Sequence, residues 1–202
     1  PIRKFKPYAD KAKEKGIHVY FLNIGDPDIP TPQPVLEAFH NFNDEVLSYG
    51  PAQGFLELRK AIASYYNVYG IPLTEENVII TTGGSEAIHF SFSVVADPGK
   101  EIIIPEPFYT NYNGYASFAS VKIVPLTLRV EDGFRLPQVK EIEAKISKKT
   151  RALLLCSPNN PTGTVYTNEE LERVISVVKK HDLFLIGDEV YKEFVYDGAI
   201  HN

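Results

Sequence analysis

Two uninterrupted apolar runs near the end of the chain, residues 152–156 and 183–186, constrain its fold more than any other feature of the sequence. Between them we predict one amphipathic helix over residues 167–181, because Thr167 and Glu170 have the spacing of a capping box and apolar residues follow at helical intervals. Such a strand–helix–strand unit forms two parallel strands with a right-handed crossover in nearly all cases. Residues that follow the two strands therefore meet at one edge of a sheet, where open α/β sheets bind their ligands.

The sequence from residue 78 onward repeats this alternation of apolar runs and helical patterns. Unbroken apolar strands are typical of a parallel sheet that helices cover on both faces. We therefore predict an α/β fold, a three-layer sandwich around a mostly parallel sheet. Strands are expected at residues 78–81, 101–104, 122–125, 151–156 and 183–187, and helices at residues 84–96, 109–119, 137–146 and 167–181.

The residues ahead of 78 indicate a different organisation, with little strand. Thr31 followed by Pro32 is a typical helix start. A polar connection at residues 41–45 marks a boundary, so we expect residues 1–45 to form an N-terminal segment and residues 46–202 a larger domain. Helices are expected at residues 3–15, 32–39 and 54–69, and a short strand at residues 19–23.

Composition excludes several partners and compartments. The net charge of -5 is spread without a basic cluster, which argues against nucleic acid and anionic membranes. No apolar run approaches the roughly 20 residues that span a bilayer. The lone Cys156 allows no internal disulfide, no signal peptide is visible, and the 5 histidines show no ligand spacing, so we expect a cytoplasmic protein without a metal site.

Polar residues follow both apolar runs of the strand–helix–strand unit. Asn160 lies in the turn-prone run from Ser157 to Gly163, and Asp188 comes directly after the second run. An amide and a carboxylate are therefore expected to face one crevice. Taken alone, each also suits a structural part, Asn160 as a turn residue and Asp188 as a cap at a strand end.

The run Gly83-Gly84-Ser85 lies between an expected strand and an expected helix. Unpaired backbone N–H groups and the positive end of a helix dipole suit such a turn to a phosphate, and glycine permits close approach. The run is neither a P-loop nor a GxGxxG fingerprint, so nucleotide binding is not predicted. Taken alone, a plain turn with Ser85 as the helix cap explains it better.

Six motifs, in order along nearly the whole chain, resemble the class I and II aminotransferases of fold type I, and most closely their aspartate/aromatic branch. These enzymes use pyridoxal 5′-phosphate (PLP). The resemblance implies transfer of an amino group between an amino acid, with aspartate as a candidate, and a 2-oxo acid. The motifs are Leu22-Asn23-Ile24-Gly25-Asp26-Pro27-Asp28, Tyr49-Gly50-Pro51-Ala52-Gln53-Gly54 with Leu58-Arg59, Thr82-Gly83-Gly84-Ser85-Glu86-Ala87, Pro107-Phe108-Tyr109, Ser157-Pro158-Asn159-Asn160-Pro161-Thr162-Gly163 and Asp188-Glu189-Val190-Tyr191.

The resemblance assigns the catalytic candidates, Asp188 and Tyr191. Asp188 matches the carboxylate beside the pyridine nitrogen, where its charge favours the protonated ring. Asn160 and Tyr191 match the donors to the phenolic oxygen of the cofactor, and Asn160 also adjoins the substrate. Tyr109 matches the aromatic ring stacked on the pyridine, where many relatives carry tryptophan. Two other tyrosines of the same predicted helix, Tyr112 and Tyr115, are interpreted as packing residues.

The resemblance also implies a phosphate site and a dimer. Gly84, Ser85 and Glu86 fall at the cofactor-binding turn. Tyr49 matches a residue that reaches the partner subunit's cofactor phosphate, so a homodimer is expected. Gly25 matches the position whose backbone meets the substrate carboxylate. Residues 1–45 would then contribute to the small domain, and residues 46–202 would form a PLP-binding large domain, incomplete at its C-terminus.

Two functional residues of the family have no match here. These are the Schiff-base lysine, expected on a later strand in a Ser-x-Ser-Lys-like setting, and the arginine that clamps the substrate carboxylate. Lys192 adjoins Tyr191 at a strand end and is expected to point away from the crevice. Because the sequence also begins at Pro1, ends at Asn202 in loop-like residues and contains no methionine, we interpret it as a piece of a longer protein that is inactive alone.

Three alternatives remain open on this scaffold. One is a PLP-dependent lyase or synthase, such as a β-lyase or a cyclopropane-carboxylate synthase, which the substrate residues would distinguish. Another is the PLP-binding sensor domain of a transcription regulator, which would require a basic helix-turn-helix domain upstream. The last is a chain that binds the cofactor without catalysis because the lysine is lost.

Overall fold

The computed structural model describes residues 2–22, 25 and 28–201. The chain divides into two compact units, Pro1–Ala52 and Gln53–Asn202. The first unit contains a short 3-10 helix, η1 (Ile2–Phe5), and the helices α1 (Lys6–Glu14) and α2 (Gln33–His40). Residues 19–22 form no strand, which corrects the prediction there, and residue 23 lies outside the described residues. Among the described residues of their unit, no strand is present for residues 19–22 to pair with, and a strand requires a partner.

The second unit is built around a parallel sheet of four strands in the order β2-β1-β3-β4. These strands are β1 (Glu101–Glu106), β2 (Lys122–Thr127), β3 (Thr150–Cys156) and β4 (Phe184–Asp188). Its helices are α3 (Leu56–Val68), α4 (Gly84–Val95), α5 (Tyr112–Phe118), α6 (Val139–Glu143) and α7 (Asn168–Lys180), with 3-10 turns η2 (Glu75–Asn77) and η3 (Val130–Asp132). The predicted α/β sandwich is confirmed.

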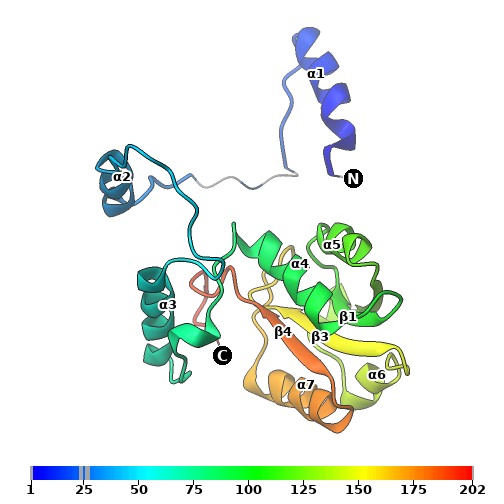
Figure 1. Cartoon of the computed structure of the whole chain (residues 1–202). Helices are drawn as coiled ribbons and strands as arrows, with labels where there is room; N and C mark the ends of the chain where they lie inside the picture. Colours follow the sequence, from blue (N-terminus) through cyan, green and yellow to red (C-terminus); the bar gives the residue numbers. More distant parts are fainter. Residues whose placement is uncertain (1, 23–24, 26–27, 202) are drawn as a thin grey trace. The chain divides into compact units, whose positions relative to one another are not determined.

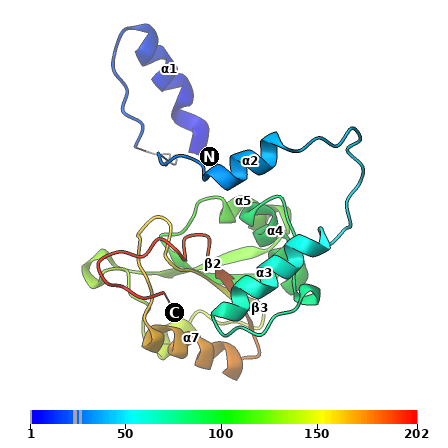
Figure 2. The ribbon, with the colours of Figure 1, turned by 90° about the vertical axis from the view of Figure 1, so that its left-hand side faces the viewer.

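Helices cover both faces of this sheet, as Figures 1 and 2 show. Side chains alternate along each strand, so neighbouring residues enter opposite cores. Ile103 and Leu153 pack in one core with residues of α6 and α7. Ile102 and Leu154 pack in the other core with residues of α4 and α5. This explains why the strands read as continuous apolar runs.

The capping box at the start of α7 forms as predicted. The Thr167 hydroxyl accepts a hydrogen bond from the Glu170 N–H at 3.3 Å, and the Glu170 carboxylate accepts one from the Thr167 N–H at 2.8 Å. Val174 and Val177 of this helix are fully buried, whereas Ile175 is 37% exposed. Local sequence and tertiary packing therefore agree on where α7 begins and which face it buries.

The strand predicted at residues 78–81 is wrong. The segment is apolar and β-branched, but no other strand of the described structure pairs with it, and propensity without a ladder makes no strand. Instead the Ile80 N–H donates to the Gln53 carbonyl at 2.9 Å. Gly54 follows with a φ of +95°, and a Cβ there would collide with the Ile80 side chain, so this contact requires glycine.

Within the described part of the chain, no helix is long and apolar enough to cross a membrane.

Candidate active site

The sheet has one topological switch point, between β1 and β3. The chain passes from β1 outward to β2 through α5, then returns across β1 to β3 and continues through α7 to β4. The crossover helices α5 and α7 consequently pack on opposite faces. In open α/β sheets the ligand crevice lies at the carboxyl ends of the strands that flank such a point. Tyr109 follows β1, Asn160 follows β3, and Asp188 ends β4, so these three predicted residues share that edge.

Asp188 is held at the end of β4 by two donors. Its Oδ2 accepts a hydrogen bond from the Tyr112 hydroxyl at 2.6 Å, and its Oδ1 accepts one from the Val190 N–H at 3.3 Å. Its backbone carbonyl accepts from the Ser157 N–H at 3.2 Å, which extends the pairing of β3 with β4 past the strand ends. The carboxylate is half-buried and fixed in direction.

Tyr112 is therefore more than the packing residue that the sequence suggested. It is 1% exposed, and its hydroxyl reaches Asp188 across the end of the sheet. Burial raises the pKa of Tyr112 far above its usual value, and the nearby Cys156 thiol and the Asp188 carboxylate raise it further. The phenol consequently stays protonated and remains a hydrogen-bond donor to Asp188 at every physiological pH.

Asn160 and Tyr191 lie next to each other at this edge of the sheet. The Asn160 Nδ2 is 3.5 Å from the Tyr191 hydroxyl. The two side chains come from the loops after β3 and β4, which are neighbouring strands. An amide donor and a hydroxyl donor at this spacing can both address one ligand oxygen.

Asn159 joins the two sides of the switch point, and no sequence pattern singles it out. Its side chain is buried, and its Nδ2 donates to the Pro107 carbonyl at 3.1 Å and to the Thr162 hydroxyl at 2.8 Å. Its backbone closes the loop, because its N–H donates to the Thr164 carbonyl at 2.9 Å. The loop that carries Asn160 is thus tied to the loop that carries Tyr109.

The turn before α4 presents backbone donors. Gly83 precedes the helix with a φ of +128°, and a Cβ at Gly83 or Gly84 would meet nothing within 4 Å. The first N–H groups of a helix have no intrahelical partner. The Glu86 carboxylate accepts from the Thr82 N–H at 2.7 Å, so its side chain closes the turn. This end of α4 is therefore open and rich in N–H donors, as an anion site requires.

Helix α5 connects this turn to Asp188. The Tyr115 hydroxyl donates to the Ser85 Oγ at 2.6 Å, while Tyr112 on the same helix donates to Asp188. Tyr115, too, was interpreted as a packing residue. The spacing of the two tyrosines, three apart on one helix face, is the sequence signal that could have identified both.

Tyr109 lies in the loop ahead of α5, and the structure places it beside Tyr112. Its ring is edge-on to Tyr112, with ring centroids 5.6 Å apart, and its hydroxyl accepts from the Asn111 Nδ2 at 2.7 Å. Partial burial raises the pKa of Tyr109 above its usual value. The ring is thus half-buried and oriented by its neighbours.

Tyr49 and Gly25 belong to the other unit, Pro1–Ala52. Both are exposed there, Tyr49 fully. Their parts in a phosphate site and a substrate site remain predictions.

Lys192 is bound by helix α3 and by its neighbour in sequence. Its Nζ donates to the Tyr65 hydroxyl at 2.8 Å, lies 3.1 Å from the Glu193 carboxylate and sits 3.6 Å from the centre of the Tyr69 ring. The hydrogen bond to Tyr65, with help from Glu193 and Tyr69, raises the pKa of Lys192 above its usual value. A lysine that forms an imine needs a lowered pKa, so Lys192 is unsuited to the role of imine-forming lysine.

Among the residues described, no group of three or more histidine, cysteine, aspartate or glutamate side chains could hold a metal ion. The polar groups at this edge are carboxylate, amide, hydroxyl and backbone N–H.

A parallel sheet with helices on both faces and polar residues gathered at its switch point defines a ligand-binding α/β protein. Residues 17–202 match a family model described as aminotransferase class I and II. The chain therefore belongs to the class I and II aminotransferase family.

Individual relatives agree with this family. The chain is 38% identical to an aspartate aminotransferase of Pyrococcus horikoshii over 202 residues, covering 99% of this chain and 50% of that protein. It is 35% identical to an aspartate/prephenate aminotransferase of Thermus thermophilus over 207 residues, covering 98% of this chain and 54% of that protein. The solved structure of an aspartate aminotransferase from Thermotoga maritima matches 100% of this chain and 54% of its own, with a TM-score of 0.92 at 32% identity. The chain thus spans about half the length of the relatives it matches.

Proposed function

We propose that the whole protein is a PLP-dependent aminotransferase that moves an amino group between an amino acid, aspartate first among the candidates, and a 2-oxo acid. The observation that carries this proposal is that the Asp188 carboxylate, fixed by Tyr112, ends β4 and lies beside the loops that follow β3 and β4. These two loops carry the Asn160–Tyr191 pair. The names of the relatives support aspartate as the amino donor. Because all of these relatives are aminotransferases, we propose neither a lyase nor a regulator.

The residues at this edge fit PLP. The open turn at Gly83 and Gly84 offers N–H donors for a phosphate, with Ser85 beside them. Asp188 offers the negative charge that a protonated ring nitrogen requires. Asn160 and Tyr191 offer two neighbouring donors for a phenolic oxygen. The donor set therefore matches the phosphate, the ring nitrogen and the phenolic oxygen of this cofactor.

When bound, PLP would accept electron density from the α-carbon of the amino acid. The Asp188 carboxylate would keep a proton on the ring nitrogen by direct charge pairing, and Tyr112 would hold that carboxylate in place. Asn160 and Tyr191 would donate hydrogen bonds to the phenolic oxygen and stabilise its negative charge. Tyr109 would cover one face of the ring.

The remaining assignments follow the family. We propose that Gly25 and Asn160 contact the substrate, and that Glu86 contributes to the cofactor turn. Residues 1–45 are assigned to a small domain and residues 46–202 to the PLP-binding domain. We place the imine-forming lysine and the substrate-clamping arginine in the half of the relatives' length that this chain does not span. A cytoplasmic location is proposed because Cys156 is buried and reduced.

Steady-state kinetics of the full-length protein test this function. With PLP, L-aspartate and 2-oxoglutarate, we expect production of the 2-oxo acid matching aspartate, and parallel double-reciprocal lines, because the two substrates react in turn. A panel of other amino acids ranks the donors. A full-length protein that takes up no PLP, or that releases ammonia instead of transferring the amino group, would overturn the proposal.

A further prediction concerns Tyr49. We propose that the full-length protein is a homodimer in which Tyr49 reaches the partner's cofactor phosphate. Tyr49→Phe should then weaken cofactor retention by about 1–3 kcal/mol, the value of one hydrogen bond to a charged group. Equilibrium dialysis of PLP measures it, and Tyr20→Phe, also exposed in the same unit, is the control. A fully active monomer would contradict this assignment.

Tyr112 provides another prediction. Tyr112→Phe should lower kcat by about tenfold or more, since Asp188 loses a hydrogen bond to a charged acceptor. The reduction should be the same across the working pH range, because the raised pKa of Tyr112 keeps the phenol protonated throughout. The pH profile of kcat for both proteins measures it. Tyr66→Phe, half-buried on α3, is the control. A variant with wild-type kcat would show that Tyr112 only packs.

A further inference from the structure

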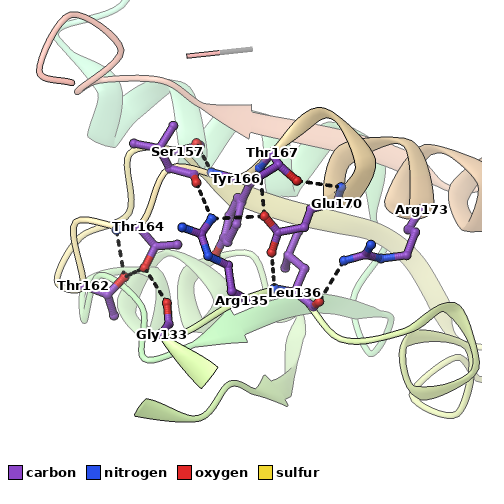
Figure 3. Close-up of polar contacts among 11 residues, drawn as sticks. Gly133, Arg135, Leu136, Ser157, Thr162, Thr164, Tyr166, Thr167, Glu170 and Arg173 are labelled. Atoms are coloured by element: carbon purple, nitrogen blue, oxygen red, sulfur yellow. Dashed lines mark hydrogen bonds and ion pairs between the residues drawn. The ribbon is translucent and has the colours of Figure 1, made fainter. Parts of the chain in front are cut away.

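Glu170 is a buried carboxylate that binds more groups than a helix cap needs. It is 3% exposed. Its Oε2 accepts from the Thr167 N–H at 2.8 Å, which completes the capping box. Its Oε1 accepts from the Leu136 N–H at 2.7 Å, and its Oε2 lies 3.2 Å from an Arg135 guanidinium nitrogen. Figure 3 shows these contacts converging on the carboxylate. We call Arg135, Leu136, Thr167 and Glu170 the Glu170 brace.

The brace fastens the segment of residues 133–136 along the loop of residues 162–167. Arg135 donates to the Val165 carbonyl at 2.7 Å as well as facing Glu170. The Thr164 hydroxyl donates to the Gly133 carbonyl at 3.4 Å. Arg173 of α7 donates to the Leu136 carbonyl at 3.1 Å, which secures the far end of the same segment (Figure 3). The outer arm of the loop is thus held at several points.

The inner arm of this loop carries Asn160. The Asn159 N–H donates to the Thr164 carbonyl at 2.9 Å and the Gly163 N–H to the Asn159 carbonyl at 2.8 Å, so the arms close on each other. The Asn160 side chain itself has a long contact with Tyr191, at 3.5 Å. Its position therefore depends on the loop backbone, and the loop backbone depends on the brace.

Burying the Glu170 carboxylate costs free energy unless all its partners are present. A buried carboxylate is stable when it is paired and hydrogen-bonded, and replacing it leaves its partners' N–H groups without an acceptor. A neutral glutamine has one carbonyl oxygen in place of two charged oxygens, so it cannot satisfy Leu136, Thr167 and Arg135 together. Glu170→Gln should consequently loosen the loop.

We propose that Glu170 is a positioning residue for Asn160, acting through the closed loop to aim the amide at the phenolic oxygen of the cofactor. This inference rests on the proposed function. A donor to the phenolic oxygen stabilises the negative charge of that oxygen and so lowers the pKa of the bound cofactor, which its absorbance reports. Losing the donor therefore raises this pKa. Glu170→Gln should raise this pKa, as Asn160→Ala does, but by less.

A double-mutant cycle in the full-length protein tests the proposal. Glu170→Gln should raise the absorbance pKa in the wild-type background and leave it unchanged in the Asn160→Ala background, since coupled residues are not additive. Glu172→Gln, exposed on the same helix α7, is the matched control and should have no effect. Equal shifts in both backgrounds, or a lowered melting temperature with no shift, would overturn the proposal. Should Glu170→Gln fold poorly, Arg135→Gln removes the more exposed partner and should give the same pattern.

Hydrogen exchange of the cofactor-free protein gives a second readout. Amides of residues 159, 160 and 162–164 should exchange about tenfold faster in Glu170→Gln than in Glu172→Gln, the scale of one lost hydrogen bond. Unchanged exchange would overturn the proposal that the Glu170 brace holds this loop, whether or not the cofactor binds. A wild-type protein that binds no PLP would instead overturn the proposed function, so the two failures are distinguishable.

Discussion

Replacing Asp188 by asparagine in the full-length protein should slow the reaction with an amino acid by about a hundredfold or more, the scale of losing one preorganised charge in the transition state. Asparagine keeps the size and shape of the side chain but removes the charge that favours the protonated ring. The cofactor should still bind, because its phosphate and phenolic contacts remain. The loss therefore falls on kcat, since the charge matters far more in the transition state than in the ground state.

Single-turnover kinetics of the cofactor-loaded variant measure this effect. Asp97→Asn, on the exposed loop before β1, is the matched control. If Asp188 were only a cap at a strand end, the variant would lose about 1 kcal/mol of stability and keep a near-normal rate. That second pattern would remove the main support for the proposed site.

Gly84→Asp should lower the affinity for PLP by about a hundredfold or more, because like charges brought together cost several kcal/mol. A Cβ at Gly84 meets nothing within 4 Å, so the backbone and core can accept the change. A carboxylate in the first turn also favours the helix through its dipole. The fold should therefore persist while the phosphate site becomes negative and occupied.

Gly84→Ala separates charge from size in this experiment. It adds the same Cβ without the carboxylate, so most of the affinity should remain. Fluorescence titration of PLP into each cofactor-free variant gives the dissociation constants, and thermal unfolding checks the fold. Wild-type affinity in Gly84→Asp would place the phosphate somewhere other than the start of α4.

The sequence was sufficient to predict the part of the fold that positions the site. Continuous apolar runs indicated buried parallel strands, and the capping box located the start of α7. Right-handed connection then placed Asn160 and Asp188 at neighbouring strand ends, as the pairing of β3 with β4 shows. These features follow from local pattern and chirality, which a sequence carries directly.

The remainder depended on contacts between distant residues. Residues 78–81 have strand composition but no partner strand in the described structure, so a prediction from strand propensity fails there. Tyr112 looked like one more core aromatic, since its reach to Asp188 is set by how α5 lies over the sheet. The extra partners of Glu170 and the bridge from Asn159 to Pro107 join segments far apart in the chain, which periodicity cannot reveal.

The most direct test of the central claim is a half-reaction. The full-length protein, loaded with PLP and freed of excess cofactor, is mixed with L-aspartate alone, and the 2-oxo acid produced is measured against bound cofactor. An aminotransferase should release one equivalent, stop, and resume only when a second 2-oxo acid is added, because the amino group stays on the enzyme until an acceptor arrives. Continued turnover without an acceptor, or no product from any amino acid, would contradict the account.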